Sequence, residues 1–316
     1  MISRRILRIK ILQIIYAYYK SPGSPINKTE KELFFSIQKS YDLYHYLLRL
    51  IVTIADYAES RIEIGRNKKI PAYEDLNPNT KFIENKVIYH IRNNKQLCKY
   101  LTTNKLNWVN YPELIKGLFD KIKNSRHYKD YMNDHNNSYQ DDKKLIIDIY
   151  MADIVNYENL YQNLEEQSIF WNDEVEFIIS IIIKTIKSFS EDMGELAELL
   201  PLYKNKEDID FVKRLFRKTI INNENYRKLI KEYAENWEIE RIAFIDILIL
   251  QMAITEVIEF SSIPTKVTFN EYLEIAKFYS TSKSSKFING ILDKIITHLK
   301  EINKITKTGR GLIGEN

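Results

Sequence analysis

Apolar residues recur at intervals of three and four along most of the chain, the pattern of helices that bury one face. Residues 114–122 and 287–299 show it clearly, and residues 239–260 are apolar on nearly every side. That last segment predicts a central helix. Glycine is scarce, with 8 among 316 residues, and no run alternates apolar and polar residues as a strand does. The predicted fold class is all-α.

Capping residues and the loss of periodicity suggest where helices begin and end. Pro112 suits the first turn of a helix, and Ser284 or Ser285 is expected to cap the last one. Residues 303–316 lack apolar periodicity, so we expect a disordered tail there. Three glycines in this tail match a dinucleotide-binding motif by spacing, but no strand precedes them and no cofactor is expected.

Positive charge is concentrated at the N-terminus. The formal net charge is +4, yet residues 1–20 alone contribute +5, because they contain five basic and no acidic side chains. The rest of the chain therefore sums to −1. A local cationic patch of this kind attracts polyanions with a salt-dependent affinity.

Residues for catalysis, metal binding or membrane insertion are not apparent. Cys98 is the single cysteine, so no internal disulfide or cysteine-based metal site is expected, which suits a reducing cytoplasm. No apolar run approaches the roughly 20 residues that cross a bilayer. The acidic pair Asp141/Asp142 lies in a polar stretch and is interpreted as solvated surface. We expect a non-enzymatic protein without a cofactor, and no membrane association.

The first helix carries a cluster of arginines. At 100° per residue, Arg4, Arg5 and Arg8 fall within about a third of the helix circumference, and Lys10 adds to the charge. Guanidinium groups bind phosphate in a bidentate manner and stack on unpaired bases. The cluster therefore predicts contacts to single-stranded RNA, although three solvated arginines on a surface helix would give the same pattern.

The C-terminal helices contain further candidates. Gly290 inside a helix predicts that another backbone approaches closely, and the neighbouring Asn289 is expected to be hydrogen-bonded, either within the protein or to RNA. Lys266, Lys283 and Lys286 could extend a basic surface, or each could be an ordinary solvated lysine.

Segments at both ends resemble the NusB family. Near the N-terminus the pattern R-R-x-x-R-x-x-x-x-Q-x-x-Y stands at residues 4–16, ending at Tyr16. Nearer the C-terminus the family's signature is reproduced in order and spacing by Arg241-Ile242-Ala243, Asp246, Leu250, Glu256, Ile263-Pro264, Lys266-Val267, Asn270-Glu271, Ala276-Lys277 and the run from Lys286 to Asp293.

The resemblance implies a fold of two small helical bundles. It covers residues 1–66 and 205–302, and typical members are less than half as long as this chain. Residues 67–204 are therefore interpreted as a helical insertion of unknown role.

The resemblance also implies a function in transcription regulation. NusB proteins support antitermination in the transcription elongation complex, chiefly on ribosomal RNA, by binding the boxA element of single-stranded RNA together with the ribosomal protein NusE. Arg4, Arg5 and Arg8 match the family's RNA-binding motif. Tyr16 and Asp246 match positions on the first helix and the NusE-facing helix, and the Asp246 carboxylate needs either a basic partner group or an internal cation.

One loop departs from the family pattern, and two other functions remain open. Residues 280–283 lack the usual glycine, and Lys283 stands where an acidic residue can occur, which favours phosphate contact. NusB-like domains also occur fused to RNA cytosine methyltransferases, so the chain could be a relative of those enzymes. It could also be a structural helical scaffold in ribosome assembly.

Overall fold

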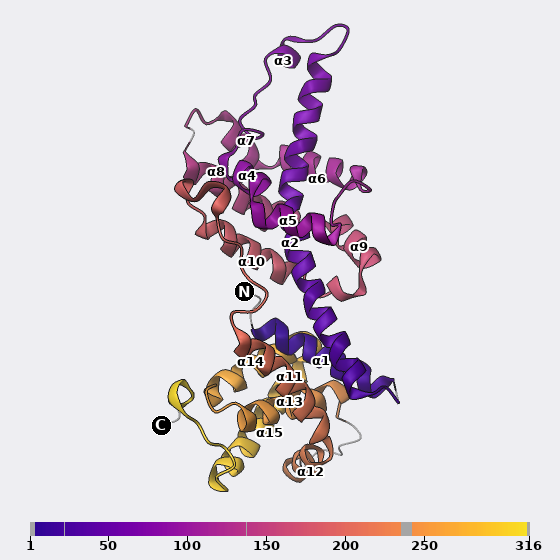
Figure 1. Cartoon of the computed structure of the whole chain (residues 1–316), viewed down its shortest axis with the longest axis vertical. Helices are drawn as coiled ribbons and strands as arrows, with labels where there is room; N and C mark the ends of the chain where they lie inside the picture. Colours follow the sequence, from indigo (N-terminus) through magenta and orange to yellow (C-terminus); the bar gives the residue numbers. More distant parts are fainter. Residues whose placement is uncertain (1–3, 22, 137, 235–241, 315–316) are drawn as a thin grey trace. The chain divides into compact units, whose positions relative to one another are not determined.

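The computed structural model describes residues 4–21, 23–136, 138–234 and 242–314, without the side chains of Ser282 and Lys283. Across these residues every regular element is a helix, so the all-α prediction is confirmed (Figure 1). The chain forms two compact units: residues 1–37 with 203–316 make unit 1, and residues 38–202 make unit 2. None of the described helices is both long enough and apolar enough to span a membrane.

Unit 1 is built around one apolar helix, α13 (Phe244–Glu259). Every residue from Asp246 to Val257 is buried, as the all-round apolar pattern predicts. Residues 239–241 of the predicted helix lie outside the described residues. Five helices contact α13, which explains its burial: α1 (Arg4–Lys20), α11 (Lys206–Ile221), α12 (Asn223–Tyr233), α14 (Thr265–Tyr279) and α15 (Ser282–Glu301).

The start and the outer face of α15 differ from the predictions. Thr281, not Ser284 or Ser285, caps this helix: its extended backbone lets Oγ1 accept a hydrogen bond from the Ser284 N–H at 3.3 Å. The expectation of a close backbone at Gly290 is wrong, because a Cβ placed there would meet no atom within 4 Å. Gly290 faces solvent.

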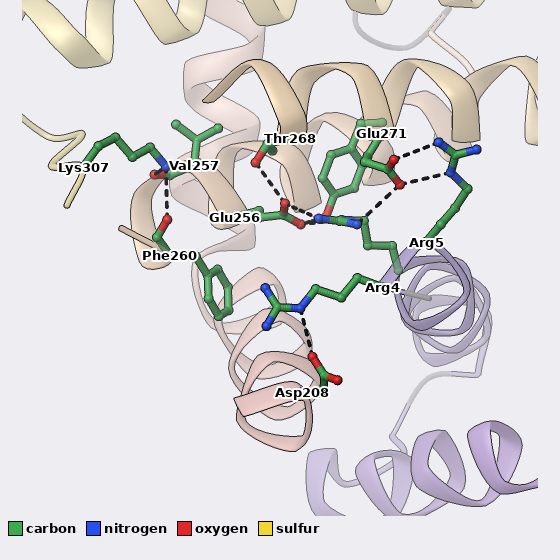
Figure 2. A network of polar contacts seen from close by, with 11 residues as sticks. Arg4, Arg5, Asp208, Glu256, Val257, Phe260, Thr268, Glu271 and Lys307 are labelled. Atoms are coloured by element: carbon green, nitrogen blue, oxygen red, sulfur yellow. Dashed lines mark hydrogen bonds and ion pairs between the residues drawn. The ribbon is translucent and has the colours of Figure 1, made fainter. Parts of the chain in front are cut away.

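The tail, where the sequence predicted disorder, contacts the end of α13 and the residues after it through Lys307, Thr308 and Gly311. Lys307 Nζ donates to the carbonyl oxygens of Val257 at 3.0 Å and Phe260 at 3.1 Å, satisfying acceptors at the helix C-terminus (Figure 2). A short 3-10 helix, η5 (Gly309–Leu312), follows. There a Cβ on Gly311 would lie 1.9 Å from the Ser261 carbonyl oxygen, so only glycine fits. Hydrogen bonds of this kind leave no apolar period in the sequence.

Unit 2 contains the later part of the 41-residue helix α2 and a set of shorter helices. Pro112 begins α6, as predicted. The elements of unit 2 in chain order are α2 (Ile26–Arg66, shared with unit 1), α3 (Tyr73–Leu76), α4 (Lys86–Asn93), α5 (Lys95–Asn104), α6 (Pro112–Asn124), α7 (Arg126–Asn133), α8 (Tyr139–Asp148), η1 (Ile149–Ile154), α9 (Glu158–Gln167), η2 (Ile169–Trp171), α10 (Val175–Ser188) and η3 (Glu191–Leu196).

Polar side chains hold the interior of unit 2 together at two places. Asp142, expected to be solvated, is buried and accepts hydrogen bonds from Tyr131 Oη at 2.6 Å and the Lys86 N–H at 2.8 Å. It therefore links α7 and α8 to the start of α4. His45 on α2 stacks on Tyr100 with ring centroids 3.7 Å apart. Burial lowers the pKa of His45 to about 4.

Candidate nucleic-acid interface

The basic charge of the protein resides in unit 1. Residues 1–37 and 203–316 contain 26 Lys and Arg and 18 Asp and Glu, a formal charge of +8. Residues 38–202 contain 21 and 25, a formal charge of −4. A polyanion is therefore attracted to unit 1, which carries every candidate RNA-binding residue predicted from the sequence.

Arg8 lies in the interior of unit 1, not on its surface. Only 3% of the side chain is exposed, and it pairs with the fully buried Glu256. The pairing is bidentate, from Nε to Oε2 at 2.7 Å and from Nη2 to Oε1 at 2.6 Å. The predicted RNA contact is therefore corrected for Arg8: its guanidinium has no exposed face for a phosphate and instead joins α1 to α13.

The Glu256 carboxylate is fully supplied with hydrogen-bond donors. Thr268 Oγ1 donates to it at 2.9 Å and Tyr272 Oη at 3.0 Å, both from α14. Burial is the largest single effect and lowers the pKa of Arg8, but the charge and hydrogen bonds of Glu256, together with the charges of Tyr272 and Glu271, outweigh it and raise the pKa. Burial, with Glu256 as a neighbour, also raises the pKa of Tyr272. The cluster is thus a fixed ion pair joining three helices.

Arg4 and Arg5 lie at the edge of this cluster and keep donors toward solvent. Arg4 is 33% exposed and its Nε donates to Asp208 on α11 at 2.9 Å. Arg5 is 38% exposed and binds Glu271 on α14 through Nε at 3.0 Å and Nη2 at 2.7 Å, as Figure 2 shows. A guanidinium has five N–H donors. Arg4 therefore has four N–H donors, and Arg5 three, that make no hydrogen bond to a described residue.

The remaining predicted RNA-binding residues divide into buried and exposed ones. Lys10 is buried, so the structure corrects its prediction as well: this ammonium does not face solvent. Lys266 at the start of α14, and Lys286 and Asn289 on α15, are exposed. The Lys283 side chain lies outside the described residues.

The two predicted partner-binding residues lie on different helices, Tyr16 on α1 and Asp246 on α13. The half-exposed Tyr16 ring has its centroid 5.7 Å from that of Phe244. Asp246 follows two residues later, in the first turn of α13, where the helix dipole favours a carboxylate. It is buried, and its Oδ1 has no hydrogen-bond partner among the described residues.

Sequence reasoning missed the acidic partners of the arginines. Glu256 was recognisable, since a carboxylate in the middle of an all-round apolar helix requires a buried cation. Asp208 and Glu271 gave no such signal, because both lie in helices with ordinary polar faces. Phe278 was also missed: it is an apolar residue at helical spacing, yet 79% of it is exposed.

Comparison with known proteins identifies the family. The sequence profile of the NusB family matches residues 172–297, a range that starts before the second core segment expected at residue 205. No solved structure gives a significant match to the chain.

Three relatives carry the name transcription antitermination protein NusB. The one from Salinibacter ruber is 40% identical over 139 residues, which are 42% of this chain and 87% of the relative. The one from Chloroherpeton thalassium is 42% identical over 104 residues, 33% of this chain and 49% of the relative. The one from Natranaerobius thermophilus is 37% identical over 97 residues, 31% of this chain and 70% of the relative. The chain, longer than the part that it shares with each of them, belongs to the NusB family.

Proposed function

We propose that this protein is a transcription antitermination factor that binds boxA-like single-stranded RNA together with the ribosomal protein NusE. The observation that carries the RNA part is the partial exposure of Arg4 and Arg5 on the basic unit 1. The three relatives are named as antitermination proteins, which favours this function over a methyltransferase or scaffold role.

The ion pairs of Arg4 and Arg5 support phosphate binding. Glu271 binds Arg5 through two parallel hydrogen bonds, which fixes the plane of that guanidinium, and Asp208 holds Arg4 through its Nε. The other N–H groups of both arginines bind no described residue, and both side chains are partly exposed. A phosphate then binds to donors that are already oriented, so less conformational entropy is lost. Lys266, Lys286 and Asn289 are exposed on α14 and α15 and supply further contacts to the RNA in this proposal.

Equilibrium binding to a fluorescently labelled boxA-like RNA tests this surface. We expect Arg4→Ala with Arg5→Ala to weaken binding at least tenfold. Lys228 and Lys231 are exposed on α12, so removing both takes away the same charge elsewhere on unit 1 and provides a matched control. Equal loss in the two double variants would mean that only net charge matters, and the proposed site would be wrong.

The NusE part of the proposal concerns Asp246. Its buried Oδ1 lacks a hydrogen-bond donor among the described residues. A buried acceptor without a donor lowers the stability of a protein by about 1–3 kcal/mol. A basic or amide donor from NusE would supply the missing hydrogen bond.

Co-purification with the NusE ribosomal protein encoded in the same genome tests this contact. Asp246→Ala should abolish retention of NusE and leave RNA binding by the free protein intact. Asp293→Ala, which removes an exposed carboxylate of α15, should retain NusE like the wild type. Undiminished retention by Asp246→Ala would contradict the proposed role of Asp246.

A further inference from the structure

An aromatic ring is presented to solvent at the end of α14. Phe278 is the penultimate residue of this helix, and 79% of it is exposed. Neighbouring α14 residues such as Tyr272, Ile275 and Ala276 are buried. Phe278 therefore contributes little to the core of unit 1, and its ring is free to contact a ligand.

The position of Phe278 on α14 is next to residues that bind the first helix. Residues three, four and seven positions apart share one face of an α-helix, which places Phe278 in line with Glu271 and Glu274. Glu271 binds Arg5. One position after Phe278, Tyr279 Oη accepts a hydrogen bond from Gln13 Nε2 of α1 at 3.2 Å. Helix α1 thus follows α14 toward Phe278, with Arg5 on the same face.

Cationic groups lie on both sides of Phe278 in the chain, beside the carboxylates of Glu271 and Glu274. Lys277 is exposed next to the ring, although it pairs with Glu274 at 2.5 Å. Helix α15 begins four residues after Phe278, at Ser282, and its N-terminus carries a partial positive charge. Lys286 is exposed one turn further on. Single-stranded nucleic acid binds where an exposed aromatic ring has cations within reach: phosphates bind the cations and a base stacks on the ring.

We propose that Phe278 stacks on an unpaired base of the RNA whose phosphates Arg4 and Arg5 contact. The inference rests on the proposed RNA-binding function and adds a specific contact to it. Stacking is tolerant of base identity, because every base has a π-face. Phe278 therefore raises the affinity for single-stranded RNA relative to double-stranded RNA, because the paired bases of a duplex cannot stack on its ring.

A titration with a single-stranded boxA-like RNA of 12 nucleotides, labelled at one end, tests the stacking contact. Phe278→Ala should weaken binding about 5- to 150-fold, the range that loss of one base-stacking contact gives. Phe278→Tyr, which keeps the ring, should bind like the wild type. Phe35→Ala is the control, since it removes a Phe that is 51% exposed on α2 of unit 1. Its affinity should be unchanged.

The salt dependence separates stacking from charge. Phe278→Ala should leave the slope of the logarithm of affinity against the logarithm of salt concentration unchanged, because no phosphate contact is lost. RNA affinity of Phe278→Ala equal to that of Phe35→Ala would overturn the stacking contact and leave the proposed RNA binding intact. Loss of NusE retention without loss of RNA affinity would assign the ring to a protein contact, which also overturns it. No RNA binding by the wild type would remove both proposals.

Discussion

The buried pair of Arg8 and Glu256 gives the sharpest prediction about stability. Removing one member of a buried ion pair leaves the other charge desolvated and costs about 3–5 kcal/mol. Arg8 is 3% exposed and Glu256 is fully buried, and Arg8 cannot lose its proton because its pKa is raised. We therefore expect Arg8→Met to destabilise unit 1 by about 3–5 kcal/mol.

Hydrogen exchange of the α13 amides measures this loss, because the most protected amides exchange only when the structure around them unfolds. Exchange in Arg8→Met should be faster by about 100- to 4,000-fold, since 1.4 kcal/mol corresponds to a factor of ten. Arg5→Met is the matched control. It breaks a pair in which both side chains are partly exposed, so its cost should stay below about 1 kcal/mol.

A double variant separates the ion pair from the rest of the cluster. Thr268 donates to Oε1 of Glu256 and Tyr272 to Oε2. Glu256→Gln keeps one of these oxygens as an acceptor, and its NH2 group can donate to the hydroxyl oxygen that faced the other. Combined with Arg8→Met, it removes both charges, so the double variant should be more stable than Arg8→Met alone. An α13 exchange rate in Arg8→Met no faster than in Arg5→Met would refute the structural role of the pair.

Three further predictions concern other parts of the chain. His45→Phe should remove an acid sensitivity of unit 2: the pKa of His45 falls from 6.5 to about 4 on folding, so its neutral form stabilises the fold above pH 6.5 and this stability is lost as the pH falls toward 4. Urea unfolding at several pH values between 6.5 and 4 measures the free energy of unfolding. An equal dependence of this free energy on pH in the wild type and in His45→Phe would contradict the prediction. Gly290→Ala should stabilise unit 1 by about 0.5–1 kcal/mol in thermal unfolding, because the site is open and helical; a lower midpoint would show a neighbour at this site. Gly311→Ala should release the tail and expose Lys307 to limited trypsin cleavage, because the new Cβ would collide with the Ser261 carbonyl oxygen; an unchanged cleavage rate would argue against that contact.

The fold class could be predicted from the sequence because apolar periodicity reports burial directly. The central position of α13 followed from its apolar residues on every side. The packing of the tail could not be predicted, because Lys307 and Gly311 hold it through contacts to backbone carbonyl oxygens. Such contacts leave no periodic pattern of apolar residues in the sequence.

The candidate site could be predicted only in part. Helical spacing placed Arg4, Arg5 and Arg8 on one face, but spacing cannot tell a solvated face from one that contacts other helices. The acidic partners come from positions about 200 to 270 residues away in the chain. The helix N-terminus stabilises the carboxylate of Asp246, whereas Glu256 lies in the middle of the apolar helix and requires a buried cation.

The limits of the conserved core also stay predictions. The sequence places an insertion at residues 67–204, while the compact units divide near residues 37 and 202. Expression of unit 1 with residues 38–202 replaced by a short linker would show whether it folds and binds RNA alone.

The salt dependence of RNA affinity in the Arg4→Ala/Arg5→Ala double variant tests the central claim most directly. Each phosphate contact on a single strand contributes about 0.7 to the slope of log affinity against log salt concentration. If both arginines bind phosphate, the slope should become shallower by about 1.4 relative to the wild type. A slope equal to that of the wild type would mean that neither guanidinium touches the RNA backbone.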